Sequence, residues 1–201
     1  MGVAGSHVDW TLVPYVRMSF YKHYKNGMKY IAKQPFTDTN KDRKIDDEFY
    51  KQNEEVYSYA MDMTTKELDQ AVEGMYHNLN TLQSRSGNQL PFSSINYGTC
   101  TLIEGRMVIK SLLEGSIKGT GKFHKTSIFP CGIFQLMKGV NRKEGEPNYD
   151  LYQLALKSTS QRLYPNYANC DWSGNEGYDK NDPRTYFSTM GKCKCSSSKI
   201  F

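Results

Sequence analysis

The feature that most constrains the fold of this chain is a change in the spacing of its apolar residues near position 87. Before that point, apolar side chains recur every three or four residues, as on one face of a helix. Beyond it, short runs rich in β-branched and aromatic residues alternate with helical stretches. Strands that alternate with helices are typical of α/β units with parallel or mixed strands. The sequence therefore predicts an α/β fold that is preceded by helices.

The helical part is expected to hold three helices. The first should span Asp9–Tyr30 and the second Asp46–Met61, with a polar loop between them. Thr64 with Glu67 three residues later matches a capping box, which predicts the start of a third, long helix. That helix should end at the turn-forming run Ser84–Gly87.

The second part is expected to alternate strands and helices. Strands are predicted at Leu90–Tyr97 and Ser127–Met137, and helices at Glu104–Ile117 and Asn148–Leu163, the latter capped by the Asn148 side chain. From Asn166 onward the sequence is typical of loops, and the end of the chain has no period that would predict packing. No linker divides the chain into two domains.

Composition limits the class of protein. The 201 residues are 38% hydrophobic and 23% charged, the balance of a globular domain with a core. The net charge of +5 is spread along the chain, which is compatible with a nucleotide or a nucleic acid but selects neither. No apolar run approaches a membrane span. Five cysteines without framework spacing, and no export signal, favour reduced thiols and a cytoplasmic location.

Two short motifs resemble ligand loops and fail on inspection. Asp38–Ile45 begins like a calcium loop, but Arg43 replaces the required glycine and Phe49 the final glutamate, so a surface loop is expected. Gly115–Lys122 resembles a phosphate loop, but its glycine spacing is one residue too long and Phe123 replaces the magnesium-binding Ser or Thr. A glycine cluster that ends a helix is the better interpretation.

No metal site is expected either. Cys193 and Cys195 could form half of a zinc site, but the flanking sequence lacks the remaining ligands. The histidines are scattered along the chain rather than clustered, at positions His7, His23, His77 and His124.

The segment Gln83–Cys100 is the strongest candidate for a ligand site. It places an arginine, several amides, several serines and a thiol around one strand, while Gly87 and Gly98 allow close backbone approach. Such a segment could bind a phosphorylated sugar and its base. It could equally be a hydrogen-bonded turn, and the residues alone do not decide between the two.

Several long runs, in the correct order, resemble the catalytic subunit of the anaerobic, class III, glycyl-radical ribonucleoside-triphosphate reductases. The resemblance covers about Val8 to Gly191. The runs that carry it are Asp9–Arg17, Ala71–Leu82, Gln83–Cys100, Lys125–Gln135, Pro147–Thr159 and Arg162–Asn166.

The resemblance implies part of a ten-stranded α/β barrel, which would be incomplete here. In this family a glycyl radical, made by a radical-SAM activase, relays to a cysteine thiyl that abstracts the ribose 3′ hydrogen, and formate is commonly the reductant. A C-terminal zinc site is also typical. The implied partners are a ribonucleoside triphosphate substrate, dNTP or ATP effectors and a second copy at a dimer interface. Neither a membrane nor direct nucleic-acid binding is expected.

The chain departs from the family pattern after Met190-Gly191. The family continues with Cys-Arg, whereas this chain has Lys192 and then Cys193. We therefore expect residues 1–191 to be a partial reductase barrel domain with N-terminal helices, and 192–201 to be a tail outside the family. No catalytic residue is assigned, and Cys193 is not expected to carry the thiyl. The radical glycine and the zinc cysteines have no counterpart, so the chain is expected to be an inactive, truncated internal fragment that binds no cofactor.

The alternative hypothesis is a non-catalytic nucleotide-binding or subunit-interaction fragment. In either case, substrate contacts are predicted from six residues of the polar segment: Arg85, Asn88, Gln89, Ser93, Ser94 and Asn96. Strand alternation should place Ser94 and Asn96 on one face, with Ser93 and Ile95 on the other. Effector contacts and dimerisation are predicted on the first helix, from Arg17, Lys22 and Lys25.

Overall fold

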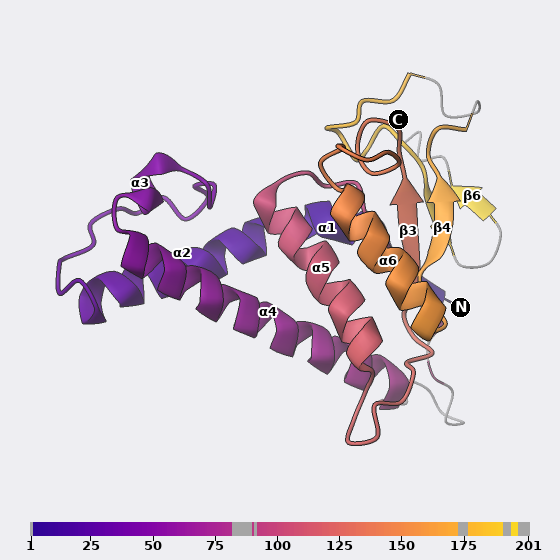
Figure 1. The fold of residues 1–201 in the computed structure, drawn as a ribbon, viewed down its shortest axis with the longest axis horizontal. Coiled ribbons are helices and arrows are strands. Elements are labelled where there is room, and N and C mark those ends of the chain that lie inside the picture. The colour runs from indigo at the N-terminus through magenta and orange to yellow at the C-terminus, as the bar shows by residue number, and fades with distance from the viewer. Residues whose placement is uncertain (1, 82–89, 91, 173–176, 191–193, 197–201) are drawn as a thin grey trace.

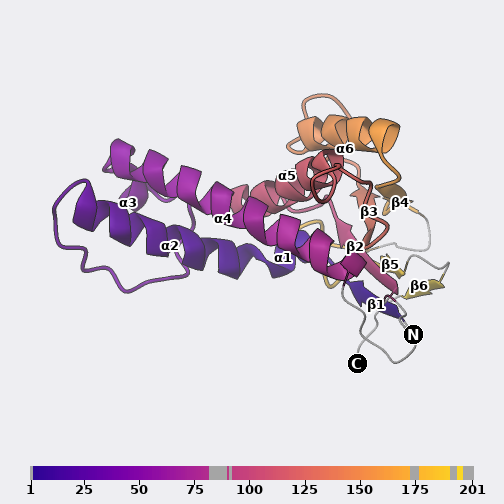
Figure 2. The same ribbon diagram turned by 90° about the horizontal axis from the view of Figure 1, so that it is seen from below.

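A long helical hairpin projects from a small parallel sheet that is covered by two further helices (Figure 1). The computed structural model describes residues 2–81, 90, 92–172, 177–190 and 194–196. The hairpin consists of α2 (Val13–Tyr30) and α4 (Glu54–Thr81), which cross in Figure 1 and run side by side in opposite directions in Figure 2. The short helices α1 (Val8–Thr11) and α3 (Glu48–Lys51) precede these two long helices.

The predicted capping box at Thr64 is wrong, because α4 continues through this position without a break. The Thr64 side chain is buried, and its hydroxyl donates to the Ala60 carbonyl one turn earlier. The Glu67 side chain instead contacts Lys22 and His23 of α2. A threonine inside a helix satisfies its hydroxyl in this way, so the local motif does not mark a helix start here.

The sheet has the order β1-β2-β3-β4, and its neighbouring strands are all parallel. Strands β2 (Phe92–Tyr97) and β3 (Cys131–Leu136) lie within the predicted strands, and α5 (Ile103–Lys118) and α6 (Tyr149–Gln161) match the predicted helices. The α/β prediction is therefore confirmed as a four-stranded parallel sheet with helices.

Two strands of this sheet were not predicted. They are β1 (Gly2–Gly5) and β4 (Asn166–Asn169), and β4 lies where only loop was expected. Both are short and lack an alternating pattern, so they become strands only because β2 and β3 offer edges to pair with. A second, antiparallel ladder joins β5 (Ser188–Met190) to β6 (Lys194–Ser196). The sequence of the tail has no period that would predict packing, yet residues 194–196 pair with β5.

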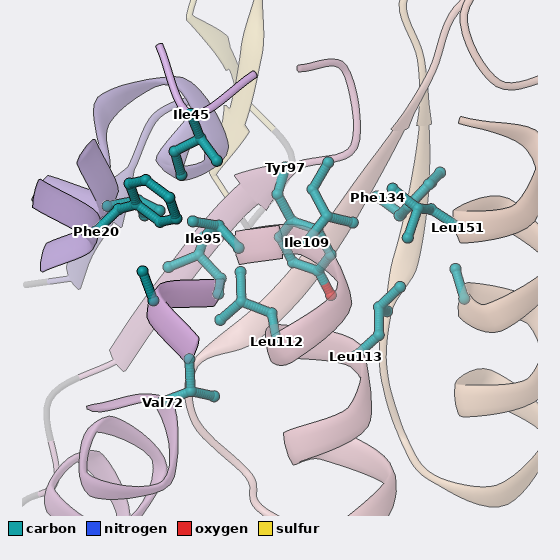
Figure 3. Close-up of a cluster of buried hydrophobic side chains, with 14 of the residues drawn as sticks. Phe20, Ile45, Val72, Ile95, Tyr97, Ile109, Leu112, Leu113, Phe134 and Leu151 are labelled. Atoms are coloured by element: carbon teal, nitrogen blue, oxygen red, sulfur yellow. The ribbon is translucent and has the colours of Figure 1, made fainter. Parts of the chain in front are cut away.

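One face of the sheet is buried under α5 and α6. Ile95, Tyr97 and Phe134 point from the strands into the same apolar cluster as Ile109 and Leu151 of these helices (Figure 3). Because side chains alternate along a strand, the opposite face of β2 and β3 carries the intervening residues. These are Ser94, Asn96, Cys131, Ile133 and Gln135.

The far half of the hairpin has its own aromatic packing. Phe20, Tyr24 and Tyr50 pack against one another at centroid distances of 4.8–6.0 Å, and all three are at most 3% exposed. Burial raises the pKa of Tyr50 to about 12. None of the helices in the described part of the chain has the length and low polarity needed to cross a bilayer.

Candidate functional site

The candidate site is the face of the sheet opposite α5 and α6, near the carboxyl ends of the strands. Parallel α/β folds bind ligands at the carboxyl ends of their strands, because the connecting loops gather there. Here the loop after β2 (98–100), the turn after β1 and the segment 186–190 meet at this edge. The polar contacts among them define what the face can do.

Asp9 organises the loop after β2. Its carboxylate is fully buried and accepts N–H groups from Gly98, Thr99 and Cys100 at 3.0, 3.0 and 2.9 Å. The Trp10 N–H adds a fourth contact at 3.2 Å. Burial raises the pKa of Asp9 above its ordinary value, and these four donors offset part of that rise. Four backbone N–H donors favour the ionised form, so we interpret Asp9 as an anion held in a nest of backbone amides.

Two asparagines close the same loop from the other side. Asn141 donates to the Gly98 carbonyl at 2.9 Å, and Asn148 donates to the Gly98 and Cys100 carbonyls at 3.2 and 2.9 Å. Asn148 does occupy the cap position of α6, but its side chain makes no capping bond. The predicted side-chain cap is therefore wrong, because the Asn148 amide binds the loop after β2 instead.

A buried polar chain links this loop to the segment before β5. The Trp10 indole donates to the Thr99 hydroxyl at 3.1 Å, and that hydroxyl lies 2.7 Å from the Tyr186 hydroxyl. His7, at a left-handed φ of 48°, packs edge-on against Tyr186 and contacts Gln135 at 3.1 Å. Burial lowers the pKa of His7 and raises the pKa of Tyr186. Both rings are therefore held neutral near neutral pH.

The predicted substrate residues fall into three groups. Arg85, Asn88 and Gln89 lie outside the described residues. Ser93 is buried on the helix-covered side, and its hydroxyl has no hydrogen-bond partner in the described part of the chain.

Ser94 and Asn96 share the face opposite α5 and α6, as alternation predicted. Ser94 is 2% exposed and lies between Ala4 and Cys131 across the sheet. Asn96 is fully buried, and its amide binds the backbone of Thr189.

The predicted effector residues are not equally free. Arg17 binds Glu104 at 2.7 Å and donates to the Asp42 carbonyl, so it ties α2 to α5 and to the loop after the hairpin's first helix. Lys22 pairs with Glu67 at 2.6 Å, which holds the pKa of Glu67 down at about 2, with the Ser19 hydroxyl adding to the effect. Lys25 is exposed.

The two rejected ligand loops have clear structures. In the loop 38–45, the Arg43 guanidinium lies 3.1 Å from Asp38 and stacks over Phe49, so a cation of the protein faces the first carboxylate of the motif. The glycine cluster ends α5, where Gly119 adopts a φ of 73°. Within the described residues, no three His, Cys, Asp or Glu side chains are grouped to hold a metal ion.

The side chains of Cys100, Cys131 and Cys170 are buried. Burial raises the pKa of Cys100 and of Cys170 to about 12. The Cys131 thiol lies 2.9 Å from the Tyr164 hydroxyl. Cys193 is outside the described residues, so the prediction about its role remains a prediction.

Sequence reasoning missed the residues that build this edge. No site role was predicted for Asp9, His7, Gln135 or Tyr186, because each is an isolated polar residue whose partners lie far away in sequence. The one available signal was Asp9 itself, an acidic residue in the first turn of a helix.

Comparison with known proteins places the chain in a family. The family model for anaerobic ribonucleoside-triphosphate reductase matches residues 2–198. The anaerobic ribonucleoside-triphosphate reductases of Haemophilus influenzae and Escherichia coli are 32% and 34% identical to it over 170 residues, which is 85% of this chain and 21% of each relative. The enzyme of Enterobacteria phage T4 is 34% identical over 82% of this chain and 24% of its own length. The chain thus spans about a fifth to a quarter of the relatives it matches, and it belongs to the anaerobic ribonucleoside-triphosphate reductase family.

Proposed function

We propose that this chain supplies part of the substrate and effector surfaces of an anaerobic ribonucleoside-triphosphate reductase, and that it does not complete a reaction cycle by itself. The observation that carries the proposal is the polar face of the parallel sheet opposite α5 and α6, in a chain matched to this family almost from end to end. In the proposed assembly this sheet forms part of a ten-stranded barrel, and this polar face lies toward the barrel interior.

On this face Ser94 is the proposed substrate contact among the described residues, together with Arg85, Asn88 and Gln89 from the preceding segment. A hydroxyl on a strand between Ala4 and Cys131 can reach a sugar or phosphate oxygen that approaches the sheet. The chemistry implied by the family, hydrogen abstraction from the ribose by a thiyl radical that a glycyl radical generates, needs a dry site. The buried network around Asp9 and Tyr186 keeps water out of one edge of such a site.

The effector surface is proposed on the hairpin. An apolar groove of about 310 Å³ runs between α2 and α4, with Ser19 and Glu67 at its polar side. Its lining includes Leu12, Tyr15 and Leu68, and Tyr15 is 66% exposed. A second copy of the chain could cover this groove, and Lys22 and Lys25 lie on the same helix as Tyr15, where they could meet effector phosphates.

Nucleotide binding tests the effector surface. Because Arg17 already binds Glu104, charge reversal at Arg17 would disturb the fold as well as the site, so Lys25→Glu is the cleaner variant. We expect Lys25→Glu to weaken dATP or ATP binding by about fivefold to tenfold, the effect of one screened phosphate contact. The matched control is Lys157→Glu, at an exposed position on α6. Equal affinities for the two variants, measured by titration calorimetry, would remove Lys25 from the site.

Turnover tests the enzymatic part of the proposal. The chain should bind ribonucleoside triphosphates but form no deoxyribonucleotide with formate and activase under strict anaerobiosis. Product formation by the chain alone would show that it holds a complete site. Absence of any nucleotide binding would contradict the proposed substrate and effector surfaces.

A further inference from the structure

Four consecutive residues before and within β5 each bind a different partner at the carboxyl edge of the sheet. The Tyr186 hydroxyl meets Thr99, the Phe187 carbonyl accepts from the Gln135 amide at 2.9 Å, and the Ser188 hydroxyl donates to Ser6 at 2.9 Å. Thr189 follows with the largest set of contacts, all to Asn96. The segment therefore lies along the ends of β1, β2 and β3 rather than looping away from them.

The Asn96 side chain pairs with the Thr189 peptide much as a neighbouring strand would. Its Oδ1 accepts the Thr189 N–H at 3.0 Å and the Thr189 hydroxyl at 3.2 Å, while its Nδ2 donates to the Thr189 carbonyl at 2.9 Å. The remaining Nδ2 hydrogen faces the Gly5 carbonyl at 3.4 Å. An amide has two donor hydrogens and one acceptor oxygen, so this set uses the hydrogen-bonding capacity of Asn96.

Gln135 repeats the arrangement on the next strand. Its Nε2 donates to Phe187, which leaves Oε1 facing the ring of His7 at 3.1 Å. His7 must therefore donate from Nδ1, and the lowered pKa of this buried ring suits the single proton required. The side-chain amides of Asn96 on β2 and Gln135 on β3 thus both bind backbone groups of the segment 186–189.

We propose that Asn96, assisted by Gln135, is a positioning residue that docks the segment 186–189 on the face opposite α5 and α6 and so fixes the position of β5 beside the sheet. The inference rests on the proposed function, because the docked segment is followed in the sequence by Met190-Gly191, after which the chain departs from the family pattern. It replaces the predicted role of Asn96 as a substrate contact.

Amide hydrogen exchange of the full chain tests the docking, read at the Thr189 N–H or on the peptide that contains 186–190. Asn96→Ala should speed exchange there by about tenfold or more, because several hydrogen bonds of roughly 1 kcal/mol each are lost. Asn80→Ala is the matched control. That amide also binds backbone, accepting the Ile128 N–H and donating to the Phe129 carbonyl, but at a different loop. It should leave 186–190 unchanged.

A conservative variant separates positioning from general stability. Asn96→Asp has the same shape, and when protonated it can both accept the Thr189 N–H and donate to the Thr189 carbonyl. When ionised it can only accept, and it faces that carbonyl with a negative charge. Protection at Thr189, corrected for intrinsic exchange and compared with wild type at each pH, should therefore return as the pH is lowered through the pKa of the new carboxyl. A variant that only loosened the fold would show no such return.

The outcomes are distinguishable. Unchanged exchange at 186–190 in Asn96→Ala would overturn the docking. So would a pH-independent Asn96→Asp, which also decides the matter if Asn96→Ala fails to fold. Weaker ribonucleoside triphosphate binding in Asn96→Ala with unchanged exchange would restore the substrate role. Loss of protection in a chain that binds no nucleotide would support the docking while removing the proposed function.

Discussion

At the scale of single residues, the most consequential group is the Asp9 carboxylate. It is a buried carboxylate that accepts backbone N–H groups of the loop 98–100 and of Trp10. That loop also receives donors from Asn141 and Asn148, so both sides of its backbone are held by side chains from distant parts of the chain. Asp9 therefore joins the first turn of helix to the strand that carries the predicted substrate residues.

Asp9→Asn should destabilise the fold by about 3 kcal/mol or more, because it puts amide hydrogens against N–H donors and removes a charge from strong hydrogen bonds. Asp62→Asn, an exposed position on α4, should change stability by less than about 0.5 kcal/mol. Urea unfolding followed by circular dichroism measures both. Equal midpoints for the two variants would show that the nest does not depend on the carboxylate.

Glu67 predicts a pH dependence. Its pKa falls from 4.5 to about 2 in the folded chain, chiefly through Lys22 and Ser19. A carboxyl whose pKa is lower in the folded chain than in the unfolded chain stabilises the fold at pH values above the unfolded pKa. The contribution of Glu67 to stability is therefore present above pH 4.5 and lost as the pH falls toward 2. Since the side chain is 45% exposed, solvent screening limits the contribution to about 1 kcal/mol at most. Glu67→Gln should flatten the stability profile in that window, whereas Glu144→Gln should retain the wild-type slope.

At the scale of elements, Gly27 allows the two hairpin helices to approach each other closely. A Cβ on Gly27 of α2 would lie 2.8 Å from Val56 and 3.1 Å from Tyr59 of α4, whereas a Cβ on Gly74 would meet nothing within 4 Å. Val56 is fully buried and β-branched, so it has little freedom to move aside. The two glycines therefore provide a matched pair within one hairpin.

Gly27→Ala should destabilise by about 1–2 kcal/mol, since the overpacking outweighs the gain in helix propensity. Gly74→Ala should instead stabilise by up to about 1 kcal/mol, because only the propensity changes. Thermal or urea unfolding gives both values. Stabilisation by both substitutions would mean that α2 and α4 can separate without cost.

At the scale of the whole molecule, the fold buries two thiols far from the end of the chain. Cys100 and Cys131 are at most 5% exposed, and the raised pKa of Cys100 further suppresses its thiolate. We predict that Cys193 and Cys195, next to Lys192 and Lys194, react with an alkylating agent before Cys100 and Cys131. Peptide mass spectrometry after brief labelling of the native chain reports the order. Protection of Cys193 at the level of the buried thiols would reopen a catalytic role for it.

The described sheet also leaves β1 and β4 paired on one side only. Open strand edges favour association between chains, so we expect the isolated chain to aggregate at concentrations where a closed fold would stay dispersed. Light scattering during a thermal melt measures this. A sharp, reversible melt of a monomer would show that the edges are protected.

The sequence by itself determined the elements whose patterns are local and long. The helices α2, α5 and α6 and the strands β2 and β3 follow from apolar spacing, and the order of long motif runs established the family. Ser94 and Asn96 also share a face as predicted, because alternation is a local property of a strand.

Only the tertiary structure decided the rest. Gly2–Gly5 becomes a strand because β2 offers a parallel edge, and α4 continues past Thr64 because that residue is buried against the hairpin. The partners of Asp9 and Asn96 lie about ninety residues away along the chain. A polar side chain does not reveal in sequence whether it will face a ligand or a distant backbone, because its hydrogen bonds are chosen only when the chain has packed.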